Sequence, residues 1–140
     1  GNKMTKEDII KLIKKQKVAI ISSINEHGYP VIRAMLRPRK IERNELYFST
    51  NLSSNKVSEY NNCPKACVYF YKKGLISYTG IALIGKMEVL TNQEIKNEIW
   101  KLGDSIFYKN GKTDPDYCVL KFTIENTRFY KDLKTEDVKF

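Results

Sequence analysis

The apolar residues near the start of the chain repeat with the spacing of a helix. Ile9, Ile10, Leu12 and Ile13 form one apolar stripe, and polar residues surround it. Thr5 precedes this stripe as a suitable N-cap residue, with acidic side chains following in the first turn. The pattern predicts an amphipathic helix that begins after Thr5.

From Val18 onward the pattern changes to β-branched and aromatic runs separated by turn signals. We expect strands over residues 18–24, 29–39, 46–50, 66–71, 75–90, 117–124 and 128–133, and helices over 54–62 and 91–102, the latter begun by a capping box from Thr91 to Glu94. Residues 103–115 are expected to be mostly loop. The tight turns at 25–28 and 42–45 favour antiparallel neighbours, so strand 29–39 is expected to pair with strand 46–50.

The order of these elements predicts a mainly β fold with flanking helices. Gly80 and Gly85 in the longest expected strand are typical of the bends or bulges that curve a sheet into a barrel. Between them, residues 81–84 are apolar on both faces, which indicates a strand covered on both sides. Helices do not alternate strictly with strands, which argues against a doubly wound α/β sheet. We therefore expect one domain spanning residues 1–140, an antiparallel β-barrel, and we treat Gly1 as a remnant of an expression tag.

The net charge of the chain changes the predicted fold and function little. The net charge of +9 would suit a polyanion, but the lysines are spread along the whole chain without a basic tail. A lysine-rich solvated surface is the preferred interpretation. A nucleic-acid-binding β-barrel stays open as an alternative, for which only Tyr69 and Tyr71 before Lys72–Lys73 offer the expected mixture of aromatic and basic residues.

The spacing of the cysteine and histidine residues does not indicate a metal or catalytic site. Cys63, Cys67 and Cys118 form no C-x-x-C pair, and His27 lies in a turn far from them, so no metal site is expected. Cys67 and Cys118 fall within apolar strands, where buried and inert thiols are common. No catalytic acid, base or nucleophile stands out. We expect a cytoplasmic protein without membrane contact, because no apolar run of about 18 residues and no signal peptide is present.

The first candidate site lies where strand 46–50 meets the following helix. Thr50, Ser53 and Ser54 cluster there with Lys56. The free amide groups at a helix N-terminus, hydroxyl donors and one full positive charge suit a phosphate group. An ordinary serine N-cap beside a surface lysine explains these residues equally well.

The second candidate is strand 29–39. Alternation of side chains places Arg33, Arg37 and Arg39 on one face, with Ile32, Ala34 and Leu36 anchoring the opposite face. Arginine binds phosphate through two parallel hydrogen bonds, so this face could form the wall of an anion site near the helix. The alternative is that these arginines pair with acidic neighbours.

These segments together resemble a known family. Arg33-x-x-Leu36, Tyr47-Phe-Ser-Thr-Asn51, Ser54-x-Lys56 and Asn62-x-Pro64 are similar to the FMN site of the pyridoxamine 5′-phosphate oxidase superfamily. Gly85-Lys-Met-Glu-Val89, Trp100, Phe107-x-x-x-Gly111 and Asp114-Pro-Asp116 resemble its general-stress branch. The resemblance covers nearly the whole chain and implies a split β-barrel of Greek-key type.

The resemblance also implies roles for individual residues. Arg33 and Lys56 would hold the phosphate of FMN, helped by Thr50 and by Ser54 and Asn55 at the start of the helix. The main chain of Ala34, Met35 and Leu36 would lie along the flavin, and Ser49 would contact its ribityl chain. A homodimer with the flavin at its interface is implied, with aromatic residues near Trp100 and Phe107 contributed by the partner; Trp100 fits a core or interface position equally well.

Two departures bear on activity. Asn55 stands where the oxidases have an arginine, and their basic C-terminal signature for pyridoxal phosphate has no counterpart here. Oxidation of vitamin B6 is therefore not expected. The resemblance implies an FMN-dependent oxidoreductase acting on a small molecule, with FMN favoured over FAD. A non-catalytic flavin-binding module used under stress is the alternative.

Overall fold

The computed structural model describes residues 3–140, so Gly1 lies outside the described residues. Its elements are α1 (Lys6–Lys15), β1 (Val18–Ile24), β2 (Pro30–Leu36), β3 (Lys40–Glu42), β4 (Glu45–Asn51), α2 (Asn55–Asn62), β5 (Lys65–Lys73), β6 (Tyr78–Leu90), α3 (Gln93–Ile99), two 3-10 turns η1 (Leu102–Ile106) and η2 (Gly111–Thr113), β7 (Tyr117–Lys131) and β8 (Lys134–Asp137).

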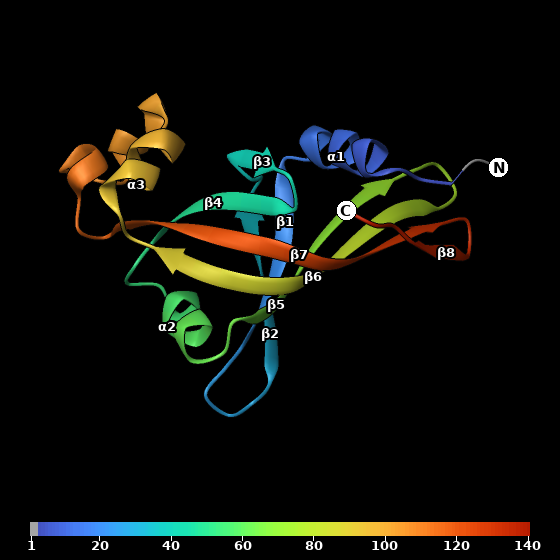
Figure 1. Ribbon diagram of the computed structural model, residues 1–140, viewed down its shortest axis with the longest axis horizontal. Coiled ribbons are helices and arrows are strands. Elements are labelled where there is room, and N and C mark those ends of the chain that lie inside the picture. Colours follow the sequence, from blue (N-terminus) through green and yellow to red (C-terminus); the bar gives the residue numbers. More distant parts are fainter. Residues whose placement is uncertain (1–2) are drawn as a thin grey trace.

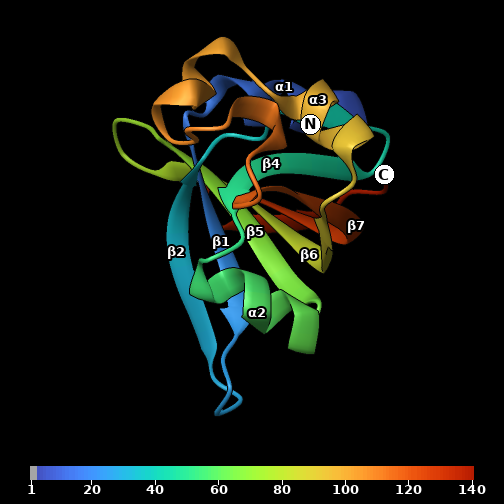
Figure 2. The ribbon, with the colours of Figure 1, turned by 90° about the vertical axis from the view of Figure 1, so that its left-hand side faces the viewer.

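All strand pairs are antiparallel, in the order β2-β1-β5-β6-β7-β4-β3, with β8 added to β7. In Figure 1, α1 and α3 lie above strands β4, β7 and β6, and α2 lies below them. Figure 2 shows how strongly the sheet curves around its interior. Across residues 3–140 no ladder joins β2 to β3, so the barrel stays split along this seam. The predicted fold class is confirmed.

Segment 29–39 differs from its prediction. It divides into β2, which pairs with β1, and β3, which pairs with β4. The Arg37 amide donates to the Lys17 carbonyl at 2.9 Å, whereas the Arg39 amide donates to the Tyr47 carbonyl at 2.7 Å. Pro38 lies between them without an N–H to continue either ladder. The predicted pairing of the whole segment with strand 46–50 is therefore wrong.

Several boundaries also differ from their predictions. The longest predicted strand begins at Tyr78 instead of residue 75, and residues 117–133 contain one strand, β7, in place of two. Helix α3 ends at Ile99, and its N-cap is Asn92, so the predicted capping box from Thr91 does not form. The predicted loop contains η1 and η2.

The expected curvature arises at Gly85. The register between β6 and β7 shifts between Ile84 and Gly85, which is a β-bulge. A Cβ atom at Gly85 would lie 1.9 Å from the Thr123 carbonyl oxygen, so no larger residue fits there without a backbone shift. The bulge lets the two longest strands bend around the core.

The core fills the interior of this curved sheet. Ile9 and Ile13 of α1 close one end, and inward-facing residues of β4, β6 and β7 fill the centre. A second cluster lies under α3, where Tyr47, Ile99, Tyr108, Tyr117 and Val119 pack together. This second cluster attaches the α3–η2 segment to the outside of β4 and β7.

The outer face of β2, β1, β5 and β6 is apolar and uncovered. We use "outer face" for its exposed residues Val18, Ile32, Leu36, Tyr71 and Ile84, which are 48%, 73%, 69%, 55% and 45% exposed. The prediction that Ile32, Ala34 and Leu36 anchor a buried face is wrong for a single chain, because β2 is an edge strand with that side turned outward. The prediction that residues 81–84 are covered on both sides fails in the same way at Ile84.

Candidate functional site

Lys56 occupies the first turn of α2, which follows the end of β4 at Asn51 after a short turn. The residue is 9% exposed, and its Nζ donates to Ser54 Oγ at 3.1 Å. Ser54 is the N-cap residue of α2, yet its side chain does not cap the helix. Burial and the nearby charge of Arg33 lower the pKa of Lys56 from its ordinary value. A buried ammonium group thus lies at a helix N-terminus.

This ammonium group has no carboxylate partner in the part of the chain that the structure describes. None of the ion pairs formed by residues 3–140 includes Lys56. A buried charge without a partner is costly and is found where a ligand supplies the opposite charge. The surroundings of Lys56 are therefore those of an anion site.

Arg33 of β2 lies in the same region, although β2 does not pair with β4. Arg33 lies there because β2 pairs with β1 and α2 packs on β1. Arg33 Nη1 donates to Ser23 Oγ at 3.0 Å, and Nη2 contacts Glu59 Oε1 at 3.1 Å. Ser23 Oγ in turn donates to Glu59 Oε1 at 2.6 Å. Arg33, Ser23 and Glu59 form a closed triangle beside Lys56.

The other two predicted arginines do not belong to this cluster. Arg39 binds Asp104 through two hydrogen bonds of 2.8 and 2.7 Å, and Arg37 is exposed, with Nη1 donating to the Lys14 carbonyl at 3.4 Å. The predicted wall of three arginines is thus wrong. The alternative of pairing with acidic neighbours describes Arg33 and Arg39.

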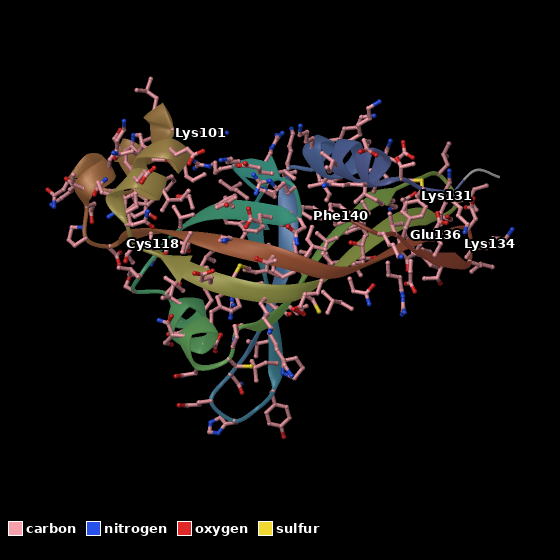
Figure 3. The ribbon with its side chains drawn as sticks, in the orientation of Figure 1. Lys101, Cys118, Lys131, Lys134, Glu136 and Phe140 are labelled. Atoms are coloured by element: carbon pink, nitrogen blue, oxygen red, sulfur yellow. The ribbon has the colours of Figure 1, made fainter. Side chains whose placement is uncertain are left out.

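Thr50 and Ser49 of β4 point to opposite faces of the sheet, as neighbouring strand residues do. Thr50 is 6% exposed and is paired with Cys118 of β7, near Lys56. Burial raises the pKa of Cys118 to about 11, so its thiol is protonated and inert near neutral pH. Ser49 lies on the face covered by the α3–η2 segment, close to Tyr108. Figure 3 shows Cys118 at the end of the molecule where α2 and α3 lie.

Strand β2 presents its main chain to the open edge of the sheet. The bonds from Arg37 to Lys17 and from Asn25 to Tyr29 fix the alternation of this antiparallel ladder. Arg33 and Met35 accordingly bond to β1, whereas the N–H and C=O groups of Ala34 and Leu36 point away from it. Met35 packs its side chain against the core, and the side chains of Ala34 and Leu36 are exposed.

Trp100 lies at the C-terminus of α3, half-buried against Tyr108 and Tyr117, with ring centroids 6.1 and 5.2 Å away. It therefore packs within the second cluster. The following η1 segment leaves Leu102, Ile106 and Phe107 largely exposed, at 94%, 82% and 74%. The ion pair between Arg39 and Asp104 holds the η1 segment against the residues that connect β2 to β3.

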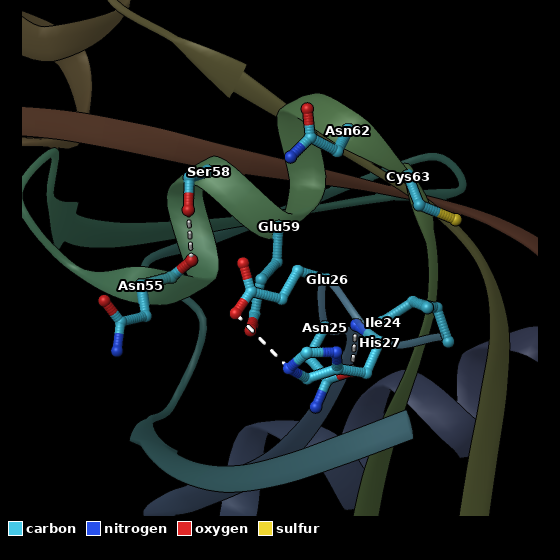
Figure 4. Close-up of a pocket in the computed structure, with 9 residues that line it drawn as sticks. All are labelled: Ile24, Asn25, Glu26, His27, Asn55, Ser58, Glu59, Asn62 and Cys63. Atoms are coloured by element: carbon cyan, nitrogen blue, oxygen red, sulfur yellow. Dashed lines mark hydrogen bonds and ion pairs between the residues drawn. The ribbon is translucent and has the colours of Figure 1, made fainter. Parts of the chain in front are cut away.

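A polar pocket of about 530 Å³ borders the triangle of Arg33, Ser23 and Glu59, between the β1–β2 turn and α2 (Figure 4). It is lined by Ile24, Asn25, Glu26, His27, Asn55, Ser58, Glu59, Asn62 and Cys63. Glu59 thus faces both the pocket and Arg33. Asn55 is exposed here, and His27 is the surface turn residue that its sequence position predicted, with Nε2 3.5 Å from Glu26 Oε1.

The sequence interpretation missed Glu59 and Ser23. Glu59 lies three residues after Lys56, hence on the same side of α2, which is the signal that could have identified it. Ser23 is a polar residue at an inward position of an apolar strand and is fully buried. Cys67, predicted to be buried, is exposed, since it faces outward from β5. Among residues 3–140 no group of His, Cys, Asp and Glu suited to a metal ion is found, and no helix there is long and apolar enough to cross a membrane.

The family model described as "Pyridoxamine 5′-phosphate oxidase like" matches residues 4–140. The chain belongs to this family. Membership in the pyridoxamine 5′-phosphate oxidase-like family confirms the resemblance noted in the sequence. No curated protein matches the chain.

Solved structures agree with this assignment. A Clostridium acetobutylicum protein related to general stress protein 26 of B. subtilis is 31% identical, with a TM-score of 0.82 over 96% of this chain and 93% of that one. General stress protein 26 from Bacillus anthracis is 20% identical, with a TM-score of 0.75 over 94% and 96% of the two chains. A heme binding protein from Mycobacterium smegmatis shares the fold at 11% identity, with a TM-score of 0.71 over 90% of this chain and 54% of that one.

Proposed function

We propose that this protein binds FMN and uses it as an oxidoreductase acting on a small organic molecule. The observation that carries the proposal is Lys56 at the start of α2. Its ammonium group is buried, has no carboxylate partner among residues 3–140 and lies beside Arg33 of β2. A phosphate monoester supplies the missing negative charge, and Thr50 and Ser54 add hydroxyl groups close by. The chain therefore fits the phosphate end of FMN.

The remainder of the cofactor would lie along the edge of β2. The outward N–H and C=O groups of Ala34 and Leu36 can donate to and accept from the polar edge of a flavin ring. The exposed side chains of Ile32 and Leu36 would supply apolar contact. In this arrangement Met35, which packs against the core, holds the strand in position.

The outer face supports a homodimer with the cofactor at its interface. Its apolar residues extend across four neighbouring strands and are continuous with the edge at β2. Such a patch is typical of a protein interface. Replacing Ile32 with lysine is expected to convert the dimer to a monomer in sedimentation, while Leu133→Lys, in the β7–β8 turn, leaves it intact. A protein that is monomeric before any substitution would contradict this part of the proposal.

FMN, when bound, supplies transfer of hydride or single electrons. The chain's own residues would bind the phosphate through Lys56 and Arg33, orient the ring through the main chain of β2 and exclude water through the outer face of a second subunit. No catalytic acid or base is assigned, since Cys118 is inert and His27 is exposed in a turn. A small substrate would approach the ring from the open side of β2.

A non-catalytic flavin-binding module is the second candidate, favoured because the one carboxylate described beside Lys56 and Arg33, that of Glu59, is already held by Arg33 and Ser23. Haem is tested alongside, because a heme binding protein shares the fold. The purified protein would be titrated with FMN, FAD and haem, followed by absorbance and flavin fluorescence. Saturable binding of FMN and its loss in Lys56→Met and Arg33→Met, but not in Lys86→Met on the surface of β6, would support the proposal.

Flavin-dependent oxidation of NADH or NADPH would then separate an oxidoreductase from a non-catalytic module. Failure to bind FMN, or binding that does not change in Lys56→Met, would refute the proposed cofactor site. If the protein binds haem and no flavin, haem takes the place of FMN as the proposed cofactor.

A further inference from the structure

The two cations of the anion site differ in one respect. Lys56 has no carboxylate partner in the described chain, whereas Arg33 is already held by Glu59 and Ser23. The side chains of Arg33 and Glu59 are 28% and 16% exposed, so water screens this pair only in part. Glu59 thus reduces the charge of the Arg33–Lys56–Glu59 cluster from two positive charges to one.

The geometry leaves Arg33 able to bind a ligand without releasing Glu59. A guanidinium group carries five N–H donors, and Glu59 and Ser23 occupy one each. An anion placed between Arg33 and Lys56 would therefore approach the Glu59 carboxylate while both contact the same guanidinium. The repulsion between the two negative charges opposes the binding of that anion and grows with the ligand's charge.

We propose that Glu59 is a specificity-determining residue of the anion site, which sets its affinity for a dianionic phosphate by holding Arg33 and repelling the ligand. This inference rests on the proposed function. Although Glu59 holds Arg33 in place, its net effect opposes ligand binding, so the loss of its charge strengthens that binding. It also explains why a half-buried arginine–glutamate pair stands beside a buried lysine that has no carboxylate partner in the described chain.

The test compares Glu59→Gln with Glu59→Ala and with the control Glu125→Gln. Glutamine keeps an oxygen that accepts from Arg33 and removes the charge. Glu125 is a half-exposed glutamate of β7, paired with Lys86 at 3.9 Å outside the site. Dissociation constants would be measured by flavin fluorescence for FMN and for riboflavin, which lacks the phosphate.

Glu59→Gln is expected to bind FMN on the order of tenfold more tightly than the unsubstituted protein, since one partly screened negative charge is removed. Its affinity for riboflavin should stay the same, and Glu125→Gln should change neither constant. Glu59→Ala should also bind FMN more tightly, by a smaller factor, because Arg33 loses its support.

FMN binding that is unchanged or weaker in Glu59→Gln overturns the inference and makes Glu59 a supporting residue. An equal gain for riboflavin overturns it as well, because charge would not be the cause. If the unsubstituted protein binds neither flavin, the proposed function has failed instead, so the two failures are distinguishable.

Discussion

Lys56 and Lys96 offer a test of the anion site that needs no ligand. Both lysines are buried, at 9% and 6% exposure. Lys96 Nζ donates to the Asp114 carbonyl at 3.0 Å and lies 5.3 Å from the centre of the Tyr117 ring, whereas Lys56 Nζ reaches only Ser54 Oγ. The fold accommodates the ammonium group of Lys96, whereas that of Lys56 has no compensating partner among residues 3–140.

Replacement of each lysine by methionine should therefore change stability in opposite directions. Methionine retains much of the apolar stem and removes the charge. Lys96→Met loses a charged hydrogen bond and a cation–π contact, which should lower the free energy of unfolding by about 2–3 kcal/mol. Lys56→Met removes a buried charge that has no counterion in the described part of the chain, which should raise that free energy by about 1 kcal/mol in the ligand-free protein.

Urea denaturation of the ligand-free variants, followed by circular dichroism, measures both changes. Addition of FMN at 100 times its dissociation constant should stabilise the unsubstituted protein by about 2.7 kcal/mol and leave Lys56→Met nearly unchanged, which reverses their order. Loss of stability in ligand-free Lys56→Met, comparable to that in Lys96→Met, would refute the reasoning, because Lys56 would then be a structural residue.

Three further predictions concern the scaffold. Arg39→Met leaves the Asp104 carboxylate, whose side chain is 6% exposed, without its cation, and should lower the free energy of unfolding by about 3–5 kcal/mol. Arg128→Met breaks an exposed ion pair and should lower it by less than about 1 kcal/mol. Urea denaturation measures both changes. Burial acts to raise the pKa of Asp104, but the hydrogen bonds from Arg39 and from a main-chain amide outweigh it and hold this pKa below its ordinary value. The unfolded chain thus binds the proton more readily, so stability measured against pH should fall below about pH 4, and less steeply in Arg39→Met. Gly85→Ala should destabilise the protein by more than about 3 kcal/mol because of its 1.9 Å contact, while Gly103→Ala, with nothing within 4 Å, should be close to neutral; equal melting temperatures for the two would contradict the steric argument.

The sequence predicted the strands and helices of the fold well where one period continues between clear turns. Residues 18–24 and the helix at 54–62 have nearly the predicted bounds. The segment 29–39 was mispredicted because its alternation continues through Leu36 and Arg37, while the change of partner strand depends on tertiary hydrogen bonds around Pro38. Pairing between strands distant in sequence leaves no local signal of this kind.

For the candidate site, the sequence identified Lys56 and Arg33 but not the Glu59 carboxylate that pairs with Arg33. The neighbourhood of Arg33 and α2 was anticipated, although through a strand pairing that does not exist. Glu59 could be placed near Lys56 by helix spacing, yet its contact with Arg33 depends on how α2 packs on β1. The exposure of Ile32 and Leu36 was also beyond prediction, since an apolar strand face gives no indication of whether the same chain covers it.

The open edge of β2 has a consequence for the newly made single chain. Its unpaired main-chain groups lie beside exposed apolar side chains, which is the combination that promotes joining of strands from different molecules. Aggregation of newly folded chains should therefore start at β2, and anything that covers this strand should act as a protective factor during expression. If FMN and a second subunit cover β2 as proposed, the yield and solubility of the recombinant protein should depend on flavin supply and on protein concentration.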